Sequence, residues 1–181
     1  MRSMYIKAIA IGVIVLVCGV GTYLSREKPK AFRKPIAISP ETLYRVHNVL
    51  DGDTFEVEVK GVVEKVRMIG VDTPETVDPR KPPQCFGSEA SNETKKLLTD
   101  HFVYLEIDPT QYFYDKFGRI LAYVKLDEGL FVNRHLLEKG FAREYTYGKA
   151  YALSKEFKKI QKESQIKKNG LWAVCPELTK P

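Results

Sequence analysis

The feature that most restricts the fold of this chain is the alternation of apolar and polar residues between Tyr44 and Val71, which is typical of half-buried β-strands. Two short turns that contain glycine, Asp51-Gly52-Asp53 and Lys60-Gly61, divide this stretch. An Asp-Gly pair between alternating apolar runs is a strong signal for a hairpin. The sequence therefore predicts three successive strands over residues 44–50, 54–59 and 62–71.

The remainder of the chain predicts two more strands and three helices. The predicted helices cover residues 88–99, 133–139 and 151–169, and the predicted strands cover 102–107 and 120–126. Ser88 is the expected N-cap of the first helix, and Gly140 and Gly170 follow the other two, as glycine often does at helix ends. Five short strands with three helices predict an α+β fold on a small antiparallel barrel, and a five-stranded barrel of this size is OB-like.

An apolar segment precedes this predicted domain. Ala8 to Leu24 is a run of 17 residues without a charge, behind Arg2 and Lys7. One interpretation is a membrane anchor at the lower limit of length. The other is a secretory signal peptide with Gly19-Val20-Gly21 at its exit. Because this cleavage motif is weak, residues 1–24 fit an anchor slightly better than a signal peptide. We therefore expect the protein to associate with the membrane through this segment.

The positive charge of the chain lies in its N-terminal part. Residues 1–40 carry seven basic residues and one acid, whereas residues 41–181 hold 22 of each, so the net charge of +6 comes from residues 1–40. Bulk charge in the folded part therefore gives no support to nucleic-acid binding. Residues 25–40, with three prolines, predict a basic linker. The predicted domain covers residues 41–176, and residues 177–181 form a tail.

Charge and cysteines predict opposite locations for the domain. Five basic residues follow the apolar segment, and the positive-inside rule then places the domain in the cytoplasm. Cys85 and Cys175, the two cysteines of the predicted domain, can form a disulfide, and disulfides persist in oxidising compartments. The alternative is two unpaired thiols that act as small apolar residues. We predict a membrane-anchored or secreted, extracytoplasmic domain, while the two signals leave its topology open.

Acidic and basic side chains gather at the ends of the predicted strands. They are Asp51, Asp53, Arg67, Asp72, Glu75 and Arg119. Carboxylates on adjacent loops suit a hard cation such as Ca²⁺, and the guanidinium fork of arginine matches phosphate oxygens. A glutamate that does not bind the metal can orient or deprotonate a water. Together these groups predict metal-assisted hydrolysis of a phosphodiester.

Taken singly, each of these features has a structural explanation. Asp51-Gly52 is an ordinary turn sequence, and Asp72 before Thr73-Pro74-Glu75 fits a turn or a helix start, where aspartate caps well. A lone arginine on a strand usually pairs with an acid at the surface. Only the combination carries the functional prediction.

The combination resembles a known family. The strings DGDTFEV, VRMIGVDTPE, DKFGRILAYV and FAREYTY occur in the order and approximate spacing of the staphylococcal nuclease (thermonuclease) family, over residues 44–172. The resemblance implies an OB barrel with three helices and a Ca²⁺-dependent endonuclease. Such an enzyme cleaves DNA and RNA and leaves 3′-phosphate ends. We expect a monomer.

The resemblance also implies roles for individual residues. It makes Ca²⁺ ligands of the Asp53 and Asp72 carboxylates and the Thr73 backbone carbonyl, with Asp51 close to the ion. It makes Glu75 the general base, or the residue that positions the attacking water, while Arg67 and Arg119 clamp the scissile phosphate. It places Tyr145 and Tyr147 in the nucleotide pocket.

The chain departs from the family pattern in two places. Phe117 replaces the usual tyrosine before Gly118-Arg119, so stacking on a base is kept and a phenolic hydrogen bond is lost. The loop at 76–86 contains Cys85, and substrate contacts of the family cannot be transferred to it.

An alternative function is a non-catalytic OB-fold module that binds single-stranded nucleic acid. A pure binding module does not need Asp53, Asp72, Glu75 and both arginines together, so the enzyme is the favoured prediction.

Overall fold

The computed structural model describes residues 36–76, 82 and 84–175. The predicted anchor or signal peptide at 1–24, most of the predicted linker and the predicted tail at 177–181 lie outside the described residues. The described part of the linker lies against the barrel. Ile36 and Ile38 pack on the hydrophobic core, and the Ser39 amide donates to Tyr44 Oη at 2.8 Å.

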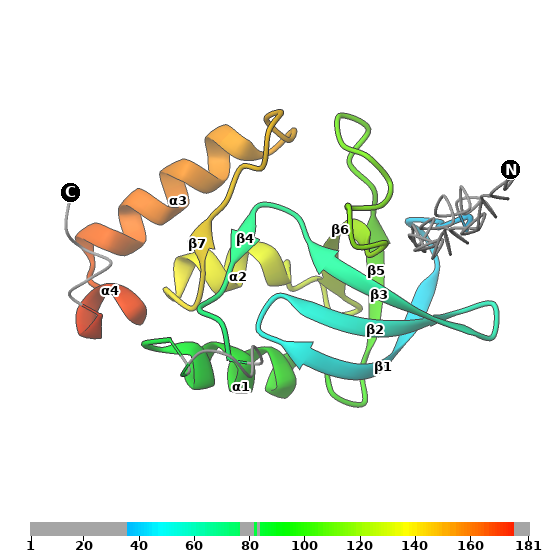
Figure 1. Cartoon of the computed structure of the whole chain (residues 1–181), viewed down its shortest axis with the longest axis horizontal. Helices are drawn as coiled ribbons and strands as arrows, with labels where there is room; N and C mark the ends of the chain where they lie inside the picture. Colours follow the sequence, from blue (N-terminus) through cyan, green and yellow to red (C-terminus); the bar gives the residue numbers. More distant parts are fainter. Residues whose placement is uncertain (1–35, 77–81, 83, 176–181) are drawn as a thin grey trace, which may run out of the picture. The chain divides into compact units, whose positions relative to one another are not determined.

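Five strands close into a barrel in the order β1-β2-β3-β6-β5 (Figure 1). Their bounds are β1 Leu43–Asp51, β2 Thr54–Val59, β3 Val62–Met68, β5 Phe102–Glu106 and β6 Ile120–Leu126. Alternate residues of β2 fill the barrel interior, since Phe55, Val57 and Val59 are fully buried. This confirms the predicted inward face of the second strand and the prediction of a five-stranded barrel.

One pair of strands departs from the predicted antiparallel arrangement. β3 and β6 run parallel, with Val66 opposite Ile120 and Met68 opposite Ala122, while the other neighbouring pairs of the barrel are antiparallel. A parallel pair needs a long crossover connection, and here the chain between the two strands includes a helix and β5. Alternation reports which face is buried and does not report strand direction, so the prediction was wrong at this pair.

The third strand also ends earlier than predicted. β3 stops at Met68, and the chain resumes as β4 (Val71–Asp72), which pairs with β7 (Arg143–Glu144) in a separate two-stranded sheet. Gly70 makes the bend with φ +76°, and a Cβ at this position would lie 2.6–2.7 Å from Tyr151 and Phe157. The apolar run through Ile69 to Val71 concealed this bend in the sequence.

The described residues form four helices, which are α1 Gly87–Leu98, α2 Val132–Glu138, α3 Ser154–Ile166 and α4 Leu171–Val174. The three predicted helices are present, and the four-residue α4 is additional. Ser88 is not the N-cap of α1. Phe86 is the cap, with φ 65° and no side-chain hydrogen bond. Within the described ranges, none of the helices has the length and apolar character that a bilayer crossing requires.

A disulfide joins Cys85 to Cys175, with Cα atoms 5.9 Å apart and 90 positions between the two residues. Of the two alternatives for these cysteines, the structure therefore has the bridge. Cys175 belongs to a small cluster with Leu171 and Trp172, and Phe86 packs against it. The bridge fastens the segment before α1 to the residue after α4.

Candidate active site

Asp51–Asp53, the turn between β1 and β2, is called the acid turn. It forms hydrogen bonds with the segment that follows β4. Asp53 Oδ2 accepts hydrogen bonds from the Thr73 amide at 3.1 Å and from Thr73 Oγ1 at 3.2 Å. Thr76 Oγ1 donates to Asp51 Oδ1 at 2.7 Å. The two acid-rich loops that the sequence predicted to be neighbours are therefore joined by hydrogen bonds.

Gly52 is needed in this turn because of a close approach. A Cβ at Gly52 would lie 2.7 Å from Thr73 Oγ1 and 2.8 Å from Thr73 Cβ. Thr94 Oγ1 of α1 donates to the Gly52 carbonyl at 2.6 Å. The Asp-Gly hairpin signal was right about the turn, and the structure adds that the glycine lets the acid turn touch Thr73.

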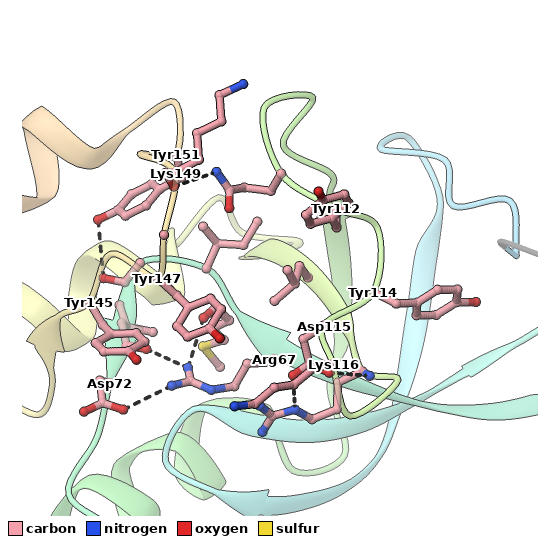
Figure 2. A pocket seen from close by; sticks show the side chains of 18 of the residues that line it. Arg67, Asp72, Tyr112, Tyr114, Asp115, Lys116, Tyr145, Tyr147, Lys149 and Tyr151 are labelled. Carbon is pink, nitrogen blue, oxygen red and sulfur yellow. Dashed lines mark hydrogen bonds and ion pairs between the residues drawn. The ribbon is translucent and has the colours of Figure 1, made fainter. Parts of the chain in front are cut away.

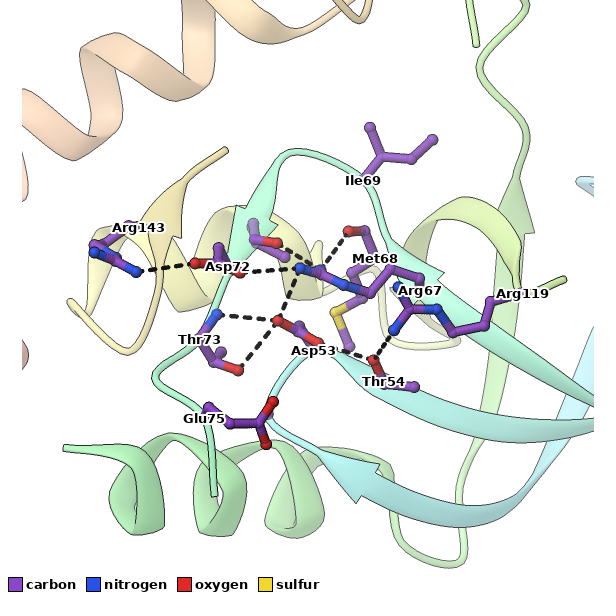
Figure 3. Close-up of polar contacts among 12 residues, drawn as sticks. Asp53, Thr54, Arg67, Met68, Ile69, Asp72, Thr73, Glu75, Arg119 and Arg143 are labelled. Atoms are coloured by element: carbon purple, nitrogen blue, oxygen red, sulfur yellow. Dashed lines mark hydrogen bonds and ion pairs between the residues drawn. The ribbon is translucent and has the colours of Figure 1, made fainter. Parts of the chain in front are cut away.

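Arg67 lies between two of the predicted metal ligands (Figure 3). Its Nη2 is 3.1 Å from Asp53 Oδ2 and 3.2 Å from Asp72 Oδ1. Its Nη1 donates to the backbone carbonyls of Val71 at 2.6 Å and Met68 at 3.1 Å. These four contacts fix the guanidinium, whose side chain is only 12% exposed. The pairing neutralises charge that two close carboxylates would otherwise oppose.

Arg119, the residue directly before β6, reaches the same cluster. Its Nε donates to Asp115 Oδ2 at 2.6 Å, and its Nη1 donates to Thr54 Oγ1 at 3.3 Å. Thr54 Oγ1 in turn donates to Asp53 Oδ1 at 2.9 Å. A chain of polar contacts thus runs from one arginine to the other through Thr54 and Asp53.

Asp51 is buried at the end of β1, in the acid turn. Burial raises the pKa of Asp51 above its ordinary value of 3.8, and the negative charges of Asp53 and Glu75 raise it further. Hydrogen bonds from Thr76 and the Gly52 backbone oppose this rise. Asp51 is thus held beside two other acids, an arrangement that favours the approach of positive charge.

Glu75 lies on the segment between β4 and α1, beyond Thr73 (Figure 3). The residue is half-buried. Its backbone amide donates to Gln84 Oε1 at 3.1 Å, and its carbonyl accepts from the Gln84 amide at 3.0 Å. Its negative charge contributes to the raised pKa of Asp51 in the acid turn.

The oxygen atoms of this cluster are of the type that a hard cation binds. Asp53 and Asp72 converge on a single atom, Arg67 Nη2, and Ca²⁺ takes carboxylate and backbone carbonyl oxygens together. In the part of the chain that the structure describes, no three His, Cys, Asp or Glu side chains lie close enough to form a metal-binding group. Asp53 and Asp72 would therefore supply only part of the predicted Ca²⁺ ligand set, to which the Thr73 backbone carbonyl is predicted to add a third oxygen.

A cleft of about 870 Å³ opens beside the two arginines (Figure 2). Its lining residues include Arg67, Asp72, Arg119, Tyr145 and Tyr147. The acid turn, Thr73 and Glu75 are not among its lining residues. The structure therefore brings the arginines and the aromatic residues to one cleft, with Asp53 and Thr73 behind Arg67.

Three aromatic side chains of the cleft, Tyr145, Tyr147 and Phe117, are open to solvent. Tyr145 is 47% exposed, and Tyr147 and Phe117 are each 67% exposed. The two tyrosine rings stack with their centroids 6.4 Å apart. Lys116 Nζ lies 5.0 Å from the Phe117 centroid and 5.6 Å from the Tyr147 centroid. Exposed rings with a cation beside them can stack on nucleobases and attract a phosphate chain.

Sequence reasoning missed three polar residues of the site. Arg143 Nη2 contacts Asp72 Oδ2 at 3.0 Å, Asp115 holds Arg119, and Lys116 lines the cleft. All three stand inside the strings that carried the family resemblance, FAREYTY and DKFGRILAYV. Charged residues in such strings are the signal that could have found them.

Comparisons with known proteins give a consistent result. A family model described as staphylococcal nuclease homologue matches residues 65–174. A thermonuclease of Staphylococcus hyicus is 43% identical over 133 residues, covering 74% of this chain and 77% of that protein. A thermonuclease of Staphylococcus intermedius is 39% identical over 170 residues, covering 92% and 98%. The endonuclease YncB of Bacillus subtilis (strain 168) is 37% identical over 131 residues, covering 72% and 61%.

Proposed function

The chain belongs to the staphylococcal nuclease family, and from this premise we propose that it is a nuclease. In full, the proposed function is a Ca²⁺-dependent endonuclease that hydrolyses phosphodiester bonds of DNA and RNA and leaves 3′-phosphate ends. The relatives named above are thermonucleases and an endonuclease by their names, which supports the reaction class.

One observation carries the proposal for this chain. Arg67 and Arg119 line the same cleft as Tyr145 and Tyr147, and Arg67 also contacts Asp53 and Asp72. A single cleft thus presents fixed cations, stacking rings and, behind them, oxygen ligands. Phosphodiester hydrolysis uses all three together, whereas nonspecific binding needs only the first two.

The arginines are suited to the phosphate. A guanidinium stays charged and matches two phosphate oxygens with parallel N–H groups. Arg67 is held by two backbone carbonyls, and Arg119 is held by Asp115 and Thr54. Donors fixed in this way stabilise the charge that develops on the phosphoryl oxygens without reorganising during the reaction.

Glu75 is the proposed general base, or the residue that positions the attacking water. Its carboxylate is half-buried and belongs to a segment bonded to the acid turn through Thr76. In the proposed role, the carboxylate accepts a proton from the water as the water oxygen bonds to phosphorus. The bond from phosphorus to the 5′ oxygen breaks, and the 5′ oxygen takes up a proton and leaves as a hydroxyl group, so that the phosphate stays on the 3′ end.

Asp53, Asp72 and the Thr73 carbonyl would hold Ca²⁺, with Asp51 as a nearby charge. When bound, the ion polarises a phosphoryl oxygen. Asp53 is oriented for this role by Thr54 and Thr73 hydrogen bonds, and Arg67 contacts both carboxylates.

We further propose an extracytoplasmic monomer, anchored to the membrane or released by cleavage within residues 1–24. The Cys85–Cys175 disulfide supports this location, because such bonds persist in oxidising compartments.

The experiment that separates the enzyme from a binding module uses Glu75→Gln. We expect this variant to bind single-stranded DNA about as well as wild type and to lose cleavage, since the arginines and rings that hold substrate are unchanged. The new 5′ ends of the wild-type products should be hydroxyl groups, which polynucleotide kinase labels without prior phosphatase treatment. Full cleavage by Glu75→Gln, or 5′-phosphate products from wild type, would refute the assignment.

A further inference from the structure

Gln84 holds the backbone of Glu75 on both sides. Gln84 Oε1 accepts from the Glu75 amide at 3.1 Å, and the Gln84 amide donates to the Glu75 carbonyl at 3.0 Å. The peptide groups that flank the Glu75 Cα are therefore both bonded to one residue. Because the side chain projects from this Cα, the two bonds restrict where its carboxylate can lie.

The start of α1 fixes Gln84 in turn. The Gly87 amide donates to the Gln84 carbonyl at 3.0 Å. A Cβ at Gly87 would lie 2.7 Å from Thr76 Cγ2, 3.1 Å from the Pro74 carbonyl oxygen and 3.3 Å from the Glu75 carbonyl oxygen. The first turn of α1 thus lies close to the backbone that carries Glu75, with no room for a side chain at position 87.

The disulfide ties this arrangement to the C-terminal part of the described chain. Cys85 directly follows Gln84 and is bonded to Cys175, at the end of α4. The Leu171 amide donates to the Gly140 carbonyl at 2.8 Å, which fastens α4 to the end of α2. A continuous path of bonds thus leads from α2 through α4 and the disulfide to Gln84.

We propose that Gln84 is a positioning residue for Glu75 and that the Cys85–Cys175 disulfide holds Gln84 in place. The inference rests on the proposed function, because it takes Glu75 to act on the attacking water. Gln84 is exposed and is not among the residues that line the cleft. Its effect therefore falls on the chemical step and leaves substrate binding unchanged.

The first test replaces Gln84 by methionine, which has a similar length and no acceptor oxygen. We expect Gln84→Met to lower kcat by about 10- to 100-fold, the range for a displaced catalytic group, while KM stays within about twofold. Gln84→Glu restores an acceptor and should recover most of the activity at pH 8. Gln165→Met makes the same chemical change at an exposed position of α3 and should match wild type.

The second test removes the bridge with the double substitution Cys85→Ser and Cys175→Ser. A bridge that closes a loop of this length stabilises the folded chain, so kcat is measured well below the Tm of the variant. We expect the loss of the bridge to lower kcat by about 10- to 100-fold, as Gln84→Met does. Adding Gln84→Met to the variant without the bridge should lower kcat little further, because changes that act through one contact are not additive.

Two results would overturn the positioning role while leaving the proposed function intact. One is an active wild type with Gln84→Met within twofold of its kcat. The other is a Gln84→Met loss that tracks a lower Tm and is not recovered by Gln84→Glu. A wild-type protein that cleaves no nucleic acid refutes the proposed function itself, and the positioning role falls with it. Should the cysteine variant fail to fold, the Gln84 variants decide the outcome.

Discussion

Two buried aspartates, Asp51 in the acid turn and Asp108 after β5, occupy opposite environments. They are 7% and 1% exposed. Burial raises the pKa of Asp108, but hydrogen bonds from Tyr123, Thr110 and the Ala152 amide outweigh it and lower the pKa below its ordinary value. Burial raises the pKa of Asp51, and neighbouring acids add to the rise.

We infer from this difference that Asp108 supports the fold, whereas Asp51 belongs to the proposed site. Tyr123 Oη donates to Asp108 at 2.6 Å and the Ala152 amide donates at 2.7 Å, so Asp108 connects β6 to the start of α3. Its charge is matched by donors, and it stabilises the fold. Asp51 lies beside Asp53 and Glu75, where each negative charge opposes the others. We infer that the acid turn gives up stability to keep a negative region next to the cleft.

The largest effect is expected from Arg67→Met, which removes the guanidinium that pairs with Asp53 of the acid turn. Activity should fall by about 10²- to 10³-fold, the cost of losing one preorganised charge donor. The free energy of unfolding should also fall, by about 1–3 kcal/mol, because Asp53 and Asp72 lose a buried partner. Initial rates on single-stranded DNA and denaturant unfolding measure the two effects.

Arg45→Met is the matched control, since Arg45 is an exposed residue of β1. It should leave both the rate and the unfolding midpoint close to wild type. An Arg67→Met protein with normal activity would show that the acid turn and the cleft are not one site.

The next effect concerns the fold-supporting aspartate. Asp108→Asn keeps the shape of the side chain but turns an amide nitrogen toward groups that donate to the carboxylate. We expect a loss of about 1–3 kcal/mol in the free energy of unfolding, with specific activity per folded molecule retained. Asp127→Asn, in the exposed turn after β6, makes the same change and should have no effect. An Asp108→Asn protein with the free energy of unfolding of wild type would contradict the claim that Asp108 stabilises the fold.

The smallest effect, and the sharpest test of the comparison, is the pH dependence of stability. The folded-state pKa of Asp51 is raised above 3.8, so its contribution to stability is present below that pH and is lost as pH rises through the raised pKa. The folded-state pKa of Asp108 is lowered from 3.8, so its contribution is present above that pH and is lost as pH falls.

Asp51→Asn should therefore raise the free energy of unfolding at neutral pH by up to about 1 kcal/mol, without gain at pH 3. Asp108→Asn should destabilise more at pH 7 than at pH 3. Unfolding by urea at several pH values checks both variants. Parallel pH profiles for the two variants would contradict the opposite shifts.

The β-barrel could be predicted from the sequence because its signals are local. Phe55, Val57 and Val59 alternate with polar residues, and Lys60-Gly61 has the positive φ values that a tight hairpin requires. The parallel pairing of β3 with β6 could not be predicted, because it depends on how the whole barrel closes. The bend at Gly70 was also hidden, since its cause is contact with Tyr151 and Phe157, far along the chain.

The sequence predicted which residues belong to the candidate site, but it did not predict the hydrogen bonds that join them. The turn sequence located Asp51 and Asp53, and the arginines were found from the same strings. The Thr76 bond to Asp51 and the Arg143 bond to Asp72 join residues 25 and 71 positions apart, and no periodic pattern reports such contacts. Gln84 stood in a loop where the resemblance gave no guidance, and only its two bonds to Glu75 identify it.

We propose that the acid turn and the cleft form one cation-dependent nuclease site. The most direct test is to measure the rate of single-stranded DNA cleavage with excess Ca²⁺ and again after EGTA is added. We predict cleavage with Ca²⁺, loss of nearly all activity in EGTA, and full recovery when Ca²⁺ is restored. An equal rate in the presence and absence of the chelator would contradict the claim.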